Sequence, residues 1–72
     1  MSTTIDARGL SCPQPVLMTM DEIKKGKENE IIVQVDSEAS KENVSRAAAS
    51  QGCRVREVSQ DGEEYNIAIV RD

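Results

Sequence analysis

The chain contains no histidine, tryptophan or phenylalanine, and only two of its 72 residues are cysteines. Without histidine, a Cys–His pair for nucleophilic acyl transfer is excluded. Cys12 and Cys53 lie too far apart in sequence for a Cys-x-x-Cys redox pair, and two thiols without histidine argue against a zinc site. No glycine-rich phosphate loop is present. We therefore expect no metal and no cofactor, and a chemistry in which a single thiol reacts with a group on another molecule.

Basic residues and aromatic rings are also few. Nine lysines and arginines against thirteen aspartates and glutamates give a formal net charge of −4, and one tyrosine is the only aromatic residue. Nucleic-acid binding requires a positive face or stacking rings, so we do not expect it. No apolar run is long enough to span a bilayer, and residues 1–4 begin no signal peptide. We therefore expect a cytoplasmic protein with reduced thiols that does not act at a membrane.

The length of the chain limits the kind of site it can build. We expect residues 1–72 to form one small domain. A chain of this size buries only about 60% of its unfolded surface. The core should therefore be thin, and the working site should lie on the surface rather than in a deep cavity.

The hydrophobic pattern of the first half predicts a strand, a helix and a second strand. β-Branched residues favour a strand at residues 3–7. From Pro13 onward apolar residues recur at helical spacing, and the Lys-Lys-Gly sequence at residues 24–26 ends the helix. The inward stripe of this helix would consist of Val16, Leu17, Met20 and Ile23. Alternation predicts the next strand at residues 30–35, with Ile31, Val33 and Val35 on one face.

The second half predicts a helix and a hairpin. The helix spans residues 40–51, with Ser40 as N-cap and Gly52 just beyond its end. Its inward face would consist of Val44, Ala47 and Ala48. Strands follow at residues 53–60 and 63–70, joined by an Asp61-Gly62 turn. The order βαβαββ, with right-handed crossovers, gives an α+β two-layer sandwich in which two helices cover one face of a four-stranded mixed sheet.

One stretch, from Asp6 to Pro15, holds both prolines and one of the two cysteines. It connects the first strand to the first helix, so Cys12 falls at a strand-to-helix turn. With Cys12 as N-cap, Pro13 and Pro15 take the first and third helical positions, where a missing N–H costs no helix bond. The helix dipole there favours a thiolate. Cys12 is therefore the candidate nucleophile; the alternative, a buried small hydrophobe, suits a position between turn-forming residues poorly.

The motif Asp6-x-Arg8-Gly9-Leu10-x-Cys12-Pro13-x-Pro15 resembles the signature of the TusA/SirA-like family of small sulfur-carrier proteins. Residues 36–46 and the following Gln51-Gly52 resemble the YedF-type branch, whose TusA-like domain is often fused to a DsrE-like domain. Gln14 and Ser11 stand where TusA itself usually has an acidic and a basic residue. The resemblance therefore implies the same sandwich fold and carrier chemistry, but not the role of TusA in tRNA thiolation.

The resemblance also implies a reaction and its partners. In this family the motif cysteine carries a persulfide that passes between proteins. Cys12 would accept sulfane sulfur from a cysteine desulfurase or a rhodanese-like donor and transfer it, as a monomeric shuttle, to an acceptor thiol, for which a DsrE-like protein is a candidate. Two alternatives stay open: a non-enzymatic regulatory or interaction module that uses the same loop, and a selenium-handling variant of the carrier.

Five further motif residues are expected to support the active loop: Asp6, Arg8, Gly9, Pro13 and Pro15. Asp6 and Arg8 form a salt bridge or turn hydrogen bond that shapes the loop, or Arg8 presents its charge to a persulfide anion or a partner. Gly9 supplies a backbone conformation that other residues avoid. The prolines determine where the sulfur points.

Two residues outside the motif also allow two interpretations. Cys53 begins a strand and is expected to be an inert, partly buried thiol; the alternative is a second sulfur-handling group. Met18 lies off the inward stripe of the first helix, and is either a tolerated surface methionine or a contact for a partner.

Overall fold

The structure is a computed structural model that describes residues 2–10, 13–26 and 29–71. Its six elements follow the predicted order, which confirms the βαβαββ arrangement. They are β1 (Ser2–Asp6), α1 (Gln14–Lys25), β2 (Glu30–Val35), α2 (Glu38–Ser50), β3 (Cys53–Asp61) and β4 (Glu64–Arg71).

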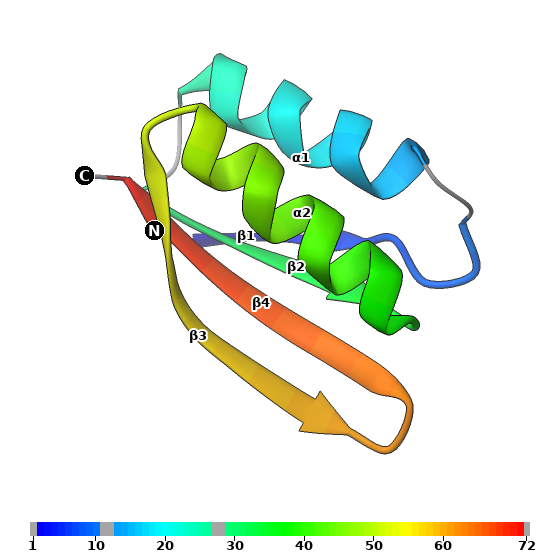
Figure 1. Cartoon of the computed structure of the whole chain (residues 1–72). Coiled ribbons are helices and arrows are strands. Elements are labelled where there is room, and N and C mark those ends of the chain that lie inside the picture. Colours follow the sequence, from blue (N-terminus) through cyan, green and yellow to red (C-terminus); the bar gives the residue numbers. More distant parts are fainter. Residues whose placement is uncertain (1, 11–12, 27–28, 72) are drawn as a thin grey trace.

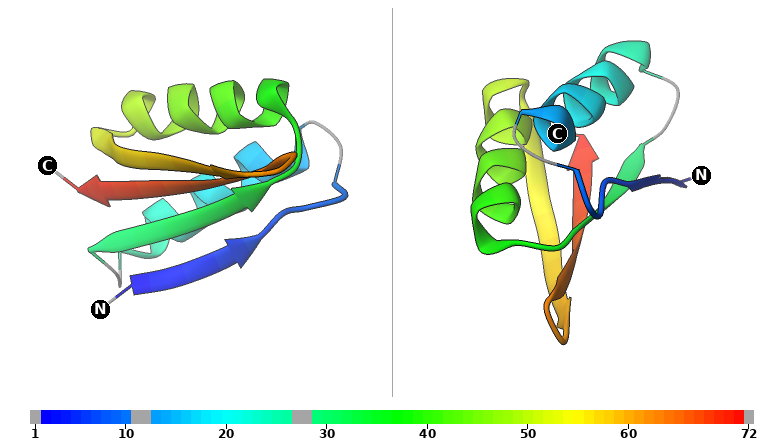
Figure 2. Two further views of the ribbon diagram at one scale, coloured as in Figure 1. Left: turned by 90° about the horizontal axis from the view of Figure 1, so that it is seen from below. Right: turned by 90° about the vertical axis from the view of Figure 1, so that its right-hand side faces the viewer.

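The four strands form one mixed sheet in the order β1-β2-β4-β3. β1 and β2 are parallel, from the pair Ser2–Glu30 to the pair Asp6–Gln34, and β4 is antiparallel to both β2 and β3. Both helices cover the same face of the sheet and contact each other (Figures 1 and 2). The predicted two-layer α/β sandwich is therefore confirmed. None of the helices among the described residues is both long and apolar enough to cross a bilayer.

The core lies between the sheet and the two helices. On β2, Val33 and Val35 are fully buried, as the alternating pattern predicts. On α2, Val44 and Ala48 are fully buried and Ala47 nearly so, which confirms the predicted inward face. Because this face is small, the helix backbone can approach the sheet closely.

The start and the inward face of α1 differ from the prediction. Cys12 lies outside the described residues, and the N-cap is Pro13, so Pro15 takes the second helical position instead of the third. Both positions fall within the first turn, where the N–H that proline lacks has no helical partner. Leu17 was predicted to face inward but is 58% exposed, and Thr19 is fully buried in its place.

Burial of Thr19 is possible because its hydroxyl is satisfied within the helix. Its Oγ1 donates to the carbonyl of Pro15 at 2.8 Å. A buried hydroxyl with a hydrogen-bond partner avoids most of the cost of leaving water. The inward face of α1 therefore consists of Pro15, Thr19 and Ile23, which are spaced four residues apart. The prediction missed this face because it assigned only apolar side chains to the core.

α2 begins earlier than predicted. Its N-cap is Ser37, not Ser40: the backbone of Ser37 is extended, and its Oγ accepts from the N–H of Ser40 at 3.1 Å. Ser40 is itself buried on the inward face. Two serines three positions apart both match the N-cap preference, and the extended backbone at Ser37 decides between them. At the other end, Gly52 follows the C-cap Gln51 with a positive φ of 79°, as predicted.

The predicted hairpin is present, and its loop lies one residue later than expected. Asp61 pairs with Glu64, so Gly62 and Glu63 form the connection. A bulge between Val55 and Glu57 interrupts the pairing of β3 with β4. Beyond it the hairpin bends away from the helices (Figure 1).

Candidate functional site

The motif residues before Cys12 form a tight turn at the carboxyl end of β1. The N–H of Ala7 donates to the carbonyl of Gln34 at 2.9 Å, which extends the pairing of β1 with β2. The N–H of Leu10 donates to the carbonyl of Ala7 at 3.4 Å and closes the turn. Gly9, at the third position of this turn, has a φ of 77°. Glycine tolerates this left-handed conformation, as the sequence predicts for this position.

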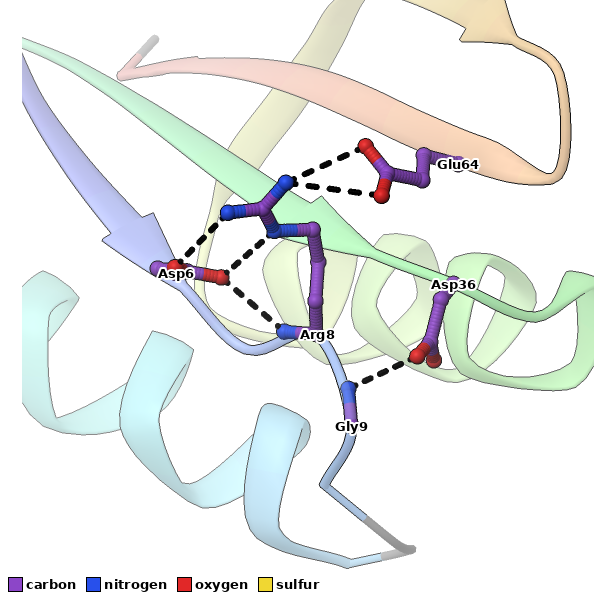
Figure 3. Close-up of polar contacts among 5 residues, drawn as sticks. All are labelled: Asp6, Arg8, Gly9, Asp36 and Glu64. Carbon is purple, nitrogen blue, oxygen red and sulfur yellow. Dashed lines mark hydrogen bonds and ion pairs between the residues drawn. The ribbon is translucent and has the colours of Figure 1, made fainter.

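Arg8 is bound to Asp6 by a two-pronged hydrogen bond (Figure 3). Its Nε donates to Oδ1 of Asp6 at 2.9 Å and its Nη2 to Oδ2 at 3.0 Å. The backbone N–H of Arg8 also donates to Oδ1, at 3.2 Å. These side-chain and backbone hydrogen bonds lower the pKa of Asp6 to about 2, and the same carboxylate raises the pKa of Arg8. The salt bridge offered by one interpretation of the sequence is therefore present.

The third nitrogen of the guanidinium contacts a residue from the far half of the chain. Nη1 of Arg8 donates to the two carboxylate oxygens of Glu64 at 3.2 and 3.4 Å. Figure 3 shows the arginine extended across the end of β2, between Asp6 on β1 and Glu64 on β4. The charge of Arg8 is thus compensated by two carboxylates, an arrangement that suits a structural tether better than a free cation presented to an anion.

Gly9 is held from the opposite side. Its N–H donates to Oδ2 of Asp36 at 2.7 Å, across 27 positions of sequence (Figure 3). Asp36 follows β2 directly, and the turn follows β1 directly. A right-handed β-α-β crossover joins parallel strands, and the carboxyl ends of parallel strands meet at one edge of a sheet. The predicted order of the elements therefore already indicated that the residues after β1 and after β2 lie close together. Neither Asp36 nor Glu64 was among the residues singled out from the motif.

On the other side of Cys12 the chain is held by the start of α1. The carbonyl of Pro13 accepts from the N–H of Leu17 at 3.0 Å, and Pro15 is fully buried. Cys12 and its neighbour at position 11 lie outside the described residues. Four predicted site residues thus flank that segment in the chain: Asp6, Arg8 and Gly9 before it and Pro13 after it. The fifth, Pro15, is buried in the first turn of α1.

Cys53 occupies a different part of the molecule. It is the first residue of β3, pairs with Arg71, and is only 7% exposed, with a free thiol. The register places this pair at the end of the sheet opposite to the turn after β1. The structure therefore agrees with the prediction of a buried thiol and separates it from the active loop.

The outer face of α1 carries exposed apolar side chains directly after the prolines. Leu17 is 58% and Met18 38% exposed. Together with Met20, Asp21 and Lys24 they line a shallow surface depression. Large apolar side chains exposed on neighbouring residues are typical of a surface that contacts other proteins.

Comparisons with known proteins agree with this fold and this motif. A family model described as sulfurtransferase TusA matches residues 3–71. No curated protein sequence matches the chain significantly. Among solved structures, the crystal structure of a SirA-like protein from Desulfitobacterium hafniense superposes with a TM-score of 0.83 at 30% sequence identity, over 94% of this chain and 95% of that one. The chain therefore belongs to the TusA family of sulfurtransferases, which act as sulfur carriers in relays with protein partners.

Proposed function

We propose that Cys12 accepts sulfane sulfur as a persulfide and transfers it to the thiol of an acceptor protein. The main support is the way the chain is held on both sides of the cysteine. Gly9 is fixed by Asp36 at 2.7 Å, and α1 begins at Gln14 with Pro13 as its N-cap. Anchors on both sides of a reactive residue favour transfer between two proteins, because they reduce the entropy that is lost when the reacting groups meet.

The proposed reaction is an exchange at sulfur. The thiolate of Cys12 attacks the outer sulfur of a persulfide on the donor. A new S–S bond forms at Cys12 while the S–S bond of the donor breaks, and the donor cysteine leaves as a thiolate. An acceptor thiolate then attacks the outer sulfur on Cys12 in the same way. Each step conserves oxidation state overall, so the transfer requires neither a cofactor nor an external oxidant.

The start of α1 supports the thiolate form of Cys12. The first turn of a helix presents partial positive charge from N–H groups without helical partners. Since Pro13 and Pro15 have no N–H, Gln14 carries the one backbone donor of the first three residues of this end. The interaction of a thiolate with an exposed helix end is worth roughly 0.3–1 kcal/mol. It therefore lowers the pKa of a thiol by less than about one unit.

The partners follow from the chemistry and from the exposed surface beside it. A cysteine desulfurase or a rhodanese-like protein is the donor, and a DsrE-like protein is the candidate acceptor, in line with the resemblance to the YedF-type branch. The exposed apolar side chains of Leu17 and Met18 are the docking contact. We further propose that residues 1–72 act as one domain and one monomer in the cytoplasm, where thiols stay reduced.

Intact-mass measurement after incubation with a cysteine desulfurase and cysteine tests this proposal. The expected product carries one added sulfur, which a reducing agent removes. Cys12→Ser should gain no sulfur, whereas Cys53→Ala should gain one. A wild-type chain of unchanged mass, or a sulfur that persists in Cys12→Ser, contradicts the proposal. Binding of a partner that survives Cys12→Ala, without any added sulfur, would instead favour an interaction module.

A further inference from the structure

Asp36 lies outside the motif that contains the cysteine, yet it is bonded to that motif. Its Oδ2 accepts the N–H of Gly9 at 2.7 Å, a short hydrogen bond to a charged acceptor. Gly9 precedes Cys12 by three positions, and after Gly9 the half-buried side chain of Leu10 packs against the core. The hydrogen bond therefore acts on the last part of the turn before the reactive segment.

The backbone that carries Asp36 is anchored on both sides by regular elements. The residue follows Val35, which is fully buried at the end of β2. β2 pairs with β1 on one side and with β4 on the other. The next residue, Ser37, caps α2, and its carbonyl accepts the N–H of Lys41 at 3.1 Å. A carboxylate held between a central strand and a capped helix is a well-fixed hydrogen-bond acceptor for the neighbouring turn.

Among the described residues, few other hydrogen bonds hold the part of the turn that Asp36 contacts. The bond that closes the turn, from Leu10 N–H to the carbonyl of Ala7, is long at 3.4 Å. Arg8 holds the opposite side through Asp6 and Glu64, and all three of these residues contact water. Through the N–H of Gly9, Asp36 at the end of β2 fixes this glycine in its left-handed conformation.

We propose that Asp36 is a positioning residue for the sulfur relay, and that it acts through the N–H of Gly9 to hold the segment that carries Cys12. This inference rests on the proposed function. In this role Asp36 acts through the backbone of Gly9 and limits where the segment can lie when a donor or acceptor arrives. Its removal should therefore lower the maximal rate of transfer and leave docking unchanged.

The test compares Asp36→Ala with Asp36→Asn, both in a Cys53→Ala background so that Cys12 is the sole thiol. Asparagine keeps an oxygen that can accept from Gly9, whereas alanine does not. The rate of sulfur loading from a cysteine desulfurase is measured against carrier concentration. We expect Asp36→Ala to lower the maximal rate about fivefold or more without changing the half-saturating concentration, and Asp36→Asn to stay within about twofold of the parent.

Three controls separate positioning from general destabilisation. Ile69→Val removes a buried methyl group from the part of the sheet that lies away from Asp36, so it should lower the melting temperature while the maximal rate stays unchanged. Asp36→Ser, whose side chain is too short to replace the contact, should behave like Asp36→Ala. Alkylation of Cys12 by iodoacetamide at high pH, where the thiol is ionised in every variant, should differ by less than about twofold, because a small reagent needs no docking geometry.

The outcomes distinguish the two proposals. If the parent chain takes up no sulfur, the proposed function is wrong, and the proposed role of Asp36 is then wrong as well. If the parent is loaded but Asp36→Ala reaches the same maximal rate, only the role of Asp36 is wrong. An Asp36→Asn variant as slow as Asp36→Ala would also overturn it, because the charge and not the hydrogen bond would then matter.

Discussion

The guanidinium of Arg8 spans the end of β2 and contacts Glu64, 56 positions later, at 3.2 and 3.4 Å. The same group holds Asp6 at 2.9 Å. In the sheet order β1-β2-β4, this side chain joins the end of the edge strand to the start of β4 across β2. Arg8 thus connects the turn after β1 to β4, a strand with which β1 does not pair.

If Arg8 acts through this tether, a lysine should not replace it. Lysine keeps the positive charge but cannot form the two-pronged hydrogen bond to Asp6. We expect Arg8→Lys and Arg8→Ala to slow sulfur loading to a similar degree, roughly three- to tenfold. Loading kinetics with a cysteine desulfurase measure both variants. A lysine variant with the parental rate would show that Arg8 presents charge to the persulfide or to the donor.

The lowered pKa of Asp6 predicts a loss of stability in acid. The pKa is about 2 in the folded chain, against an ordinary value of 3.8, chiefly because Arg8 donates hydrogen bonds to the carboxylate. The ionised form therefore stabilises the fold above pH 3.8, and this contribution falls as the pH drops towards 2. Denaturant titrations at several pH values should show that Arg8→Gln loses less stability over this window than the parent. Equal losses in the two proteins would contradict the prediction.

Replacing Gly9 should strain the turn without a steric clash. A Cβ added at this residue has no heavy atom within 4 Å, but the φ of 77° is unfavourable for other residues. We expect Gly9→Ala to cost about 1 kcal/mol in the free energy of unfolding, and Gly9→Asn less, because asparagine enters this region more readily. Chemical denaturation measures both. A cost for Gly9→Asn equal to or above that of alanine would argue against backbone strain as the cause.

The exposed apolar pair on α1 should affect docking and not reactivity. Leu17→Ser and Met18→Ser remove apolar surface that lies in water in the free chain, so stability should hardly change. We expect both to raise the half-saturating concentration of carrier in sulfur loading, about threefold or more, with iodoacetamide alkylation unchanged. Val58→Ser is a matched control, because Val58 is also exposed, at 43%, but lies on β3. An equal rise in the half-saturating concentration for Val58→Ser would show that the donor does not dock specifically on α1.

Cys53 should contribute to the core and not to sulfur transfer. Its thiol is buried at the end of the sheet opposite to the active turn. We expect Cys53→Ala to cost about 1 kcal/mol of stability through lost packing, while loading of Cys12 keeps its parental rate and stoichiometry. Intact-mass measurement and thermal unfolding check the two halves of this prediction. A loaded parent with two added sulfurs, reduced to one by Cys53→Ala, would assign Cys53 a sulfur-handling role.

The fold could be predicted because each of its elements carries a local signal. Such signals extend over a few neighbouring residues. They include the alternation at residues 30–35, the small residues that face inward on α2, and the glycine of the hairpin. Right-handed crossovers then leave few ways to assemble them. The interpretation of Asp6 and Arg8 as a salt bridge was likewise a short-range inference, since the two residues are neighbours in one turn.

The errors arose where a local rule allowed two answers. Prolines are tolerated throughout the first turn of a helix, so the motif did not decide whether α1 begins before or after Pro13. Ser37 and Ser40 both suit an N-cap, and the extended backbone selects the former. Thr19 was overlooked because a polar side chain is expected outside, although its hydroxyl is satisfied by Pro15 and can be buried.

The types and spacing of the residues were enough to predict the order of the elements, the single thiol of the motif and the family to which the chain belongs. The contacts that Asp36 and Glu64 make with the turn after β1, across 27 and 56 positions of sequence, became evident from the folded chain. The reason is physical: a strand or helix follows from the spacing of nearby side chains, whereas a contact between distant residues depends on the register in which the completed strands pair.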